Sequence, residues 1–189
     1  MQAALILKAN GADDELVAYN RRLQQLMTTI LKAEKSDAAA ESRLRTELPK
    51  LIAGIPEEKR KALGLTEEVM EGQFKMMLTP WYRYFLLYDP RPILKQVRCP
   101  VLAIAGERDL QVPPAQNLPV IAEALKAGGN KDFTTVELPG LNHLLQTSRT
   151  GSPNEYAQTE ETMSPKALEL IADWIIKHTT PQPADAKQK

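Results

Sequence analysis

The sequence is poor in the residue types that build disulfides and metal sites. Its 189 residues include one cysteine, Cys99, and two histidines. A single cysteine excludes a disulfide within the chain. We interpret Cys99, which precedes Pro100 at the start of a predicted strand, as a small buried hydrophobic residue. With so few nitrogen and sulfur ligands, a structural zinc site is not expected. No cofactor is predicted.

The chain also lacks an excess of charge of either sign and any long hydrophobic run. Twenty-four basic residues balance 24 acidic residues, so the formal net charge is zero. This balance argues against nucleic acid or an acidic membrane surface as the main partner. No run of about 18 apolar residues is present, so no transmembrane helix is predicted. The N-terminus lacks the basic start and long apolar core of a secretory signal, which predicts a cytoplasmic location for the chain as it stands.

Three segments are predicted: a helical cap or lid over residues 1–79, an α/β segment over residues 80–178 and a disordered polar tail over residues 179–189. Between residues 16 and 31, apolar side chains recur every three or four positions, as in an amphipathic helix. Later stripes in the first segment are weaker, and Thr66 precedes two glutamates at what looks like a helix start. Short helices with many charges favour a peripheral cap, and a plain helical bundle is the alternative.

The α/β segment has a strand, helix, strand, helix pattern. Residues 101–105 are apolar at every position, as in a parallel strand that is covered on both faces. A helical stripe over residues 118–125 separates them from residues 133–138, which alternate like an edge strand. Ser164-Pro165 then begins a closing helix, with serine at the cap and proline at the first position. This order predicts two parallel strands with flanking helices.

Two parallel strands do not make a stable sheet by themselves. Each large side chain of residues 101–105 that stays uncovered forfeits about 1.5–3 kcal/mol, against a net stability of about 5–15 kcal/mol for a typical domain. The sequence therefore predicts an incomplete central sheet, to be completed by further chain, by a partner or by a second copy. Because unpaired strand edges recruit other strands, we expect a homo-oligomer that associates through this edge.

An aspartate and a histidine follow the two predicted strands, at the sheet end where open α/β sheets gather their chemistry. Asp109 closes the loop after residues 101–105, and His143 closes Leu138-Pro139-Gly140-Leu141-Asn142-His143. In a serine hydrolase of this architecture the chain order is serine, aspartate, histidine. No Gly-x-Ser-x-Gly motif occurs in the sequence, so a nucleophile is not identified. The serines are Ser36, Ser42, Ser148, Ser152 and Ser164.

These motifs together resemble the α/β-hydrolase superfamily. Residues 97–113 are similar to the seventh strand and acid loop of that fold, and residues 138–143 are similar to the end of the eighth strand with its catalytic histidine. Residues 150–156 and 160–165 resemble a bacterial esterase subgroup described as dienelactone-hydrolase-like. The resemblance implies the C-terminal part of an α/β-hydrolase fold, preceded by the helical cap at residues 1–79.

The resemblance also implies a role for each matching residue. Asp109 would orient His143, and His143 would move a proton between a serine hydroxyl and the leaving alkoxide of a small ester substrate. The serine and the oxyanion loop of the family have no counterpart in this sequence. Trp81, Tyr82 and Phe85 belong to an aromatic cluster that could line the substrate pocket. Core packing is the other interpretation of this cluster.

Three functions stay open. In the first, the chain is a C-terminal fragment of a serine hydrolase acting on carboxylic esters, truncated or mis-started, which carries the acid and base and is inactive alone. In the second, it is a half-enzyme that a partner chain completes in trans. In the third, it is a non-catalytic interaction module that self-associates through its sheet edge. The sequence lacks both the serine nucleophile motif and the oxyanion loop of the family, which favours the first function.

Overall fold

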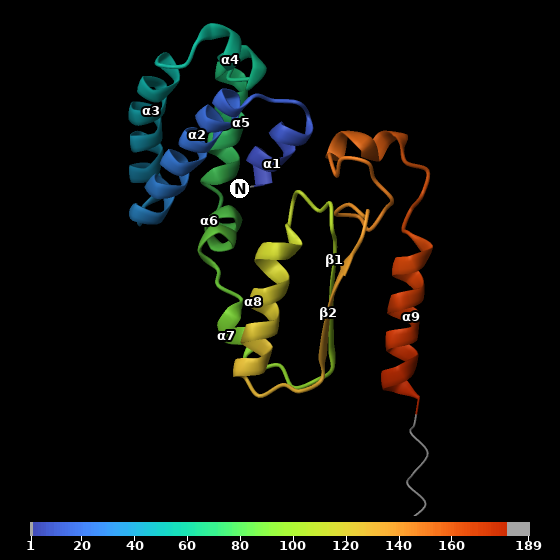
Figure 1. Ribbon diagram of the computed structural model, residues 1–189. Helices are drawn as coiled ribbons and strands as arrows, with labels where there is room; N and C mark the ends of the chain where they lie inside the picture. Colours follow the sequence, from blue (N-terminus) through green and yellow to red (C-terminus); the bar gives the residue numbers. More distant parts are fainter. Residues whose placement is uncertain (1, 181–189) are drawn as a thin grey trace, which may run out of the picture. The chain divides into compact units, whose positions relative to one another are not determined.

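The computed structural model describes residues 2–180 and divides into a helical unit and an α/β unit (Figure 1). The division falls between Asp89 and Pro90, whereas the sequence predicts it earlier, at 79/80. The segment in between belongs to the helical unit because Tyr82 and Leu86 pack against the core of that unit. Of the predicted tail, residues 181–189 lie outside the described part of the chain.

Polar caps set where the helices of the helical unit begin. Its helices are α1 (Gln2–Ala9), α2 (Asp14–Ala33), α3 (Asp37–Ala53), α4 (Glu57–Ala62), α5 (Glu67–Met77) and α6 (Pro80–Leu87). The side chains of Asp13, Ser36, Thr66 and Thr79 each accept a hydrogen bond from a backbone N–H of the first turn. The helix start predicted at Thr66 is therefore confirmed.

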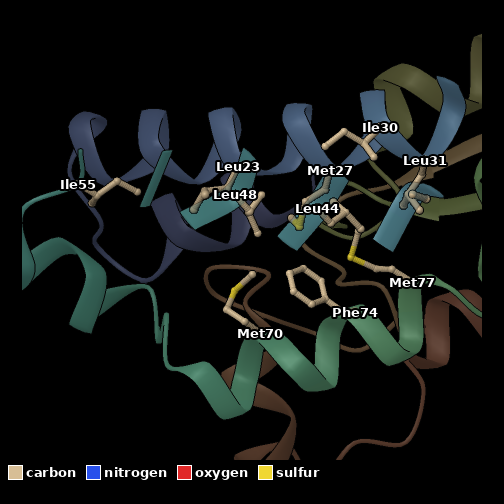
Figure 2. Packing of buried hydrophobic residues seen from close by; sticks show 11 residues of the cluster. Leu23, Met27, Ile30, Leu31, Leu44, Leu48, Ile55, Met70, Phe74 and Met77 are labelled. Atoms are coloured by element: carbon tan, nitrogen blue, oxygen red, sulfur yellow. The ribbon is translucent and has the colours of Figure 1, made fainter. Parts of the chain in front are cut away.

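A hydrophobic core joins α2, α3 and α5 (Figure 2). Ile30 from α2 and Leu44 from α3 are fully buried, and Phe74 from α5 belongs to the same cluster. The apolar stripe predicted between residues 16 and 31 supplies the α2 side of this core. The buried members are Leu23, Met27, Ile30, Leu31, Ala40, Leu44, Leu48, Ile55, Met70, Phe74 and Met77. The helical unit thus has a core of its own.

The α/β unit is built around two parallel strands. Its elements are α7 (Arg91–Leu94), β1 (Val101–Gly106), α8 (Pro114–Ala127), β2 (Phe133–Leu138), the 3-10 helix η1 (Pro153–Gln158) and α9 (Pro165–Thr179). The strands pair in register from Val101 opposite Phe133 to Gly106 opposite Leu138. Helix α8 connects the strands and packs on both, while Figure 1 shows α9 on the other side of them. The predicted strand, helix, strand, helix order is confirmed.

The sheet is open along one edge of β1. Val101 N–H donates to Asp132 O, and Glu107 N–H donates to Leu138 O. Because successive residues of a strand alternate direction, Leu102 and Ile104 turn their backbone N–H and C=O away from β2. Within the described residues β1 and β2 form the whole sheet, and Val101–Ala105 are half-buried rather than covered on both faces. The chain thus has a partial α/β fold with an unclosed sheet.

Three further expectations concern cysteine, membranes and metals. Cys99 is exposed, so the prediction of a buried cysteine is wrong; the residue lies in a bend before β1, outside the packed strand. No helix in the range 2–180 is long and apolar enough to cross a membrane. Over the same range, no group of three or more histidine, cysteine or acidic side chains is placed to hold a metal ion.

Candidate active site

Asp109 is held firmly in the loop that follows β1. Its side chain is buried, and Oδ1 accepts hydrogen bonds from Gln111 N–H at 2.9 Å and Val112 N–H at 2.8 Å. Charge-assisted bonds from backbone amides fix a carboxylate in one orientation. The second oxygen, Oδ2, is thereby turned toward the loop that follows β2.

His143 completes a hydrogen-bonded pair with Asp109. The distance from His143 Nδ1 to Asp109 Oδ2 is 2.9 Å, and the histidine side chain is 36% exposed. A carboxylate only accepts hydrogen bonds, so Nδ1 is the donor, and in the neutral ring Nε2 is then the acceptor. The structure therefore brings the two sequence-predicted residues together and leaves Nε2 as the nitrogen that can take up a proton.

The two loops that carry this pair approach each other at Gly106. A Cβ atom at position 106 would lie 2.2 Å from Leu141 O and 2.5 Å from Asn142 O. Arg108 N–H also donates to Leu141 O at 2.9 Å. Only glycine permits so close a contact between backbones, so the loop after β1 and the loop after β2 are locked side by side.

Asn142 shapes the turn that presents His143. Its side chain is fully buried, and Oδ1 accepts from Leu144 N–H at 2.9 Å and Gln146 N–H at 3.0 Å. Its Nδ2 donates to Gln146 Oε1 at 3.1 Å, and Leu145 takes a left-handed φ of 58°. Asn142 has no predicted role beyond its place in the motif at residues 138–143. An asparagine just after a strand and a glycine is the signal of such a turn.

Glu155 holds the loop 148–152, which follows the turn of His143. Its carboxylate accepts hydrogen bonds from Ser148 Oγ at 2.5 Å, Arg149 N–H at 3.0 Å and Thr150 N–H at 2.9 Å. The hydroxyl groups of Ser148 and Thr150, followed by the two backbone amides, lower the pKa of Glu155 to about 2. The sequence indicated Glu155 only as part of a segment that resembles an esterase subgroup and gave it no role, because its partners are ordinary loop residues.

Acid is expected to weaken this loop as the pH falls below the ordinary pKa of a glutamate, although Glu155 itself is protonated only near pH 2 in the folded chain. Because the pKa of Glu155 falls from 4.5 to about 2 on folding, its contribution to stability is complete above pH 4.5 and is lost as the pH falls toward 2. The difference in free energy of unfolding between the wild type and Glu155→Gln should therefore shrink between about pH 5 and about pH 2. Urea denaturation at several pH values measures it. A constant difference would contradict the assignment.

The five serines are all within the described residues, and several have structural partners. Ser148 Oγ donates to Glu155 and accepts from Gly151 N–H at 2.8 Å. Ser36 and Ser152 accept backbone hydrogen bonds at the starts of α3 and η1. Ser164 occupies the predicted cap position of α9, although its side chain makes no cap hydrogen bond. Ser42 lies inside α3.

A cavity of about 420 Å³ lies along β1 beside the aspartate and histidine. Strand β1 contributes the consecutive residues Leu102 to Ala105, and α8 contributes Leu118 and Ile121. The side chains of consecutive strand residues point to opposite faces of the sheet. A cavity lined by residues of both faces therefore lies along the edge of the strand, here the open edge of β1. Asp109 and His143 are also part of the lining. The aspartate–histidine pair thus faces a largely apolar hollow.

The aromatic pocket candidates lie in the helical unit, on α6. Trp81 and Phe85 stack with ring centroids 5.5 Å apart and planes 8° apart, and they are 67% and 66% exposed. Core packing is therefore the wrong interpretation for Trp81 and Phe85, whereas Tyr82 does pack against the helical core. The cavity beside His143 is lined by residues of the α/β unit. A substrate-binding role for Trp81, Tyr82 and Phe85 stays a prediction.

The strand pair, its connecting helix, and the aspartate and histidine at the strand ends fit a partial α/β-hydrolase fold, the fold of a superfamily that includes serine hydrolases. More narrowly, the chain belongs to the prolyl oligopeptidase family, whose family model matches residues 57–164. The match includes Asp109, His143 and both strands, and the resemblance to the α/β-hydrolase superfamily is confirmed. No curated protein and no solved structure shows significant similarity to the chain.

Proposed function

We propose that Asp109 and His143 are the acid and the base of a serine hydrolase that cleaves carboxylic esters, and that the nucleophile lies on polypeptide outside residues 1–189. The observation that carries this proposal is the 2.9 Å hydrogen bond from His143 Nδ1 to Asp109 Oδ2, beside the cavity along β1. Residues 1–189 by themselves are then inactive. The family match supports the reaction class at the level of serine hydrolases.

The geometry of the pair suits proton transfer through the second ring nitrogen. His143 Nε2 takes the proton of a serine hydroxyl while the oxygen of that hydroxyl forms a bond to the ester carbonyl carbon. The same proton then passes to the alkoxide as the C–O bond breaks, leaving an acyl-serine that water hydrolyses with His143 again acting as base. Asp109 keeps the Nδ1–H tautomer in place and stabilises the imidazolium that forms at each step.

The open edge of β1 supports a nucleophile supplied by another segment. A strand that pairs with this edge would meet the free backbone groups of Leu102 and Ile104 and would cover the apolar cavity. If that strand runs parallel to β1, its carboxyl end lies at the same end of the sheet as Asp109 and His143. One segment can therefore both close the sheet and bring a serine to His143. A partner chain that does so would make the complex a half-enzyme completed in trans.

The substrate class has two candidates. The similarity of residues 150–156 and 160–165 to dienelactone-hydrolase-like esterases supports an ester. The name of the prolyl oligopeptidase family points instead to peptides cleaved at proline. The same acid and base serve both, since each reaction passes through a tetrahedral intermediate with an oxyanion. Rates on a nitrophenyl ester and on a prolyl anilide distinguish the two.

The decisive experiment is complementation. Residues 1–189 alone should not react with a fluorophosphonate probe; together with a polypeptide carrying the Gly-x-Ser-x-Gly strand of a related hydrolase, they should yield labelling and ester hydrolysis. In that complex, His143→Ala should lower kcat by about 10³-fold or more, because the serine loses its base. The matched control is His178→Ala, which removes the other histidine and should leave kcat unchanged. Equal activity of the His143→Ala complex would refute the proposal.

Self-association is the alternative use of the same edge. A second copy could pair with β1 and cover the cavity, which favours a homo-oligomer when the chain is alone. A second copy of the chain contains the same serines as the first, so such an oligomer supplies no additional nucleophile. Sedimentation velocity combined with probe labelling separates the cases: a stable dimer that no family partner can convert into an active hydrolase would favour a non-catalytic interaction module.

A further inference from the structure

We infer that Glu155 is a positioning residue for the aspartate–histidine pair, acting through the loop 148–152. This inference rests on the proposed function of Asp109 and His143. Glu155 does not touch either of them in the hydrogen bonds described above. Its bonds instead fix a loop that packs on the backbone before Asp109, and its neighbour in η1, Tyr156, bonds to the side chain of Gln111, which follows Asp109.

The first connection reaches the residue before the aspartate. Arg108 Nη1 donates to the backbone oxygen of Ser148. Gly151 is buried and adopts a left-handed φ of 78°, and a Cβ there would lie 2.0 Å from Arg108 O. Loop and acid segment are thus in backbone contact, so a shift of the loop by a fraction of an ångström is transmitted to Arg108 and hence to Asp109.

The second connection reaches the residues after the aspartate. Tyr156, which follows Glu155 in η1, accepts a hydrogen bond from Gln111 Nε2 at 2.6 Å. Gln111 N–H is itself one of the two donors to Asp109 Oδ1. Burial raises the pKa of the Tyr156 hydroxyl, so this hydroxyl stays neutral. The segment around Glu155 therefore holds the acid loop on both sides of Asp109.

Glu155 is the centre of this arrangement because several donors of the loop share its carboxylate. Ser148 Oγ, Arg149 N–H and Thr150 N–H converge on this carboxylate. Removing it leaves these donors without that acceptor, which favours local opening of the loop. Release of the loop would loosen the orientation of Asp109, and the first observable loss would be the hydrogen bond to His143.

The test is NMR of the imidazole groups in the full 189-residue chain. With two histidines in the sequence, the Nδ1–H signal of His143 can be assigned with a His178→Ala sample. In the wild type, the bond to Asp109 should slow exchange of this proton with water. In Glu155→Ala, exchange should become roughly tenfold faster, because the bond opens more often.

Two further variants keep the test informative. Glu155→Gln retains one acceptor oxygen and the side-chain size, and it should give an intermediate increase of roughly threefold. Glu169→Ala removes an exposed glutamate from α9 and should change nothing. The ring of His178, which bonds to Trp174 O and Asp132, is an internal control for general loss of structure.

The outcomes separate the role of Glu155 from the existence of the aspartate–histidine pair. Faster exchange at His143 with unchanged His178 signals supports the positioning role. Unchanged exchange at His143 in Glu155→Gln and in folded Glu155→Ala overturns it and leaves the aspartate–histidine pair intact. A His143 Nδ1–H that exchanges freely in the wild type overturns the pair itself, and with it both the proposed function and the role of Glu155.

Discussion

Replacing Gly106 with alanine is expected to part the two loops of the candidate site and to destabilise the α/β unit by about 3 kcal/mol. The added Cβ would lie 2.2 Å from Leu141 O and 2.5 Å from Asn142 O. Both atoms belong to the backbone, so no side-chain rotation can relieve the contact. The loop of His143 must move away from the loop of Asp109, and their hydrogen bond should be lost. Urea denaturation and the His143 Nδ1–H signal measure the two effects.

Gly72→Ala is the matched control for this substitution. Gly72 lies inside α5, and a Cβ there would meet nothing within 4 Å. Since alanine is the better helix former, this variant should be unchanged or more stable by up to about 1 kcal/mol. A Gly106→Ala protein with wild-type stability and an intact His143 signal would show that the loops do not depend on their close contact.

Leu44→Ala should have an effect at least as large on the helical unit. Leu44 is 0% exposed in the core that joins α2, α3 and α5. The truncation removes three carbon atoms and leaves a cavity, which costs about 3–5 kcal/mol at such sites. This is a large share of the roughly 5–15 kcal/mol by which a domain is usually stable. Loss of helical circular dichroism in urea should therefore begin at a clearly lower concentration than in the wild type.

Leu87→Ala provides the comparison for Leu44. Leu87 ends α6 and is 57% exposed, so its truncation should change the free energy of unfolding by less than about 0.5 kcal/mol. Similar midpoints for the Leu44→Ala and Leu87→Ala proteins would mean that the packing in Figure 2 does not hold the helical unit together.

The candidate pair could be predicted from the sequence because its two residues depend on strand topology. Asp109 and His143 each follow a strand, and parallel strands bring their carboxyl ends to one edge of a sheet. The supporting residues could not be found in the same way. Asn142 and Glu155 act through backbone donors of loops, and the sequence carries no period or motif that shows where a loop will fold back.

The aromatic cluster shows a second limit of sequence patterns. Many of the aromatic residues lie between residues 74 and 88, and aromatic side chains are usually buried to a large extent. Helix α6 turns only one face to the helical core, so Tyr82 and Leu86, four residues apart, pack inward. Trp81 and Phe85 have the same spacing, but they stack on one another outside the core. The direction of each helix face depends on its neighbours in space.

The sequence by itself determined the strand, helix, strand, helix order of the α/β unit, the helix starts after Thr66 and Ser164 and the two chemical groups of the candidate site, because caps, periodicity and strand ends are local properties of the chain. It also indicated an unfinished sheet, since an apolar strand needs neighbours on both sides. Only the tertiary structure decided that Asp109 and His143 are within hydrogen-bonding distance. That distance depends on the close contact at Gly106 and on the loops held by Asn142 and Glu155. In these places residues far apart in the sequence meet through backbone atoms, and no sequence pattern encodes such contacts.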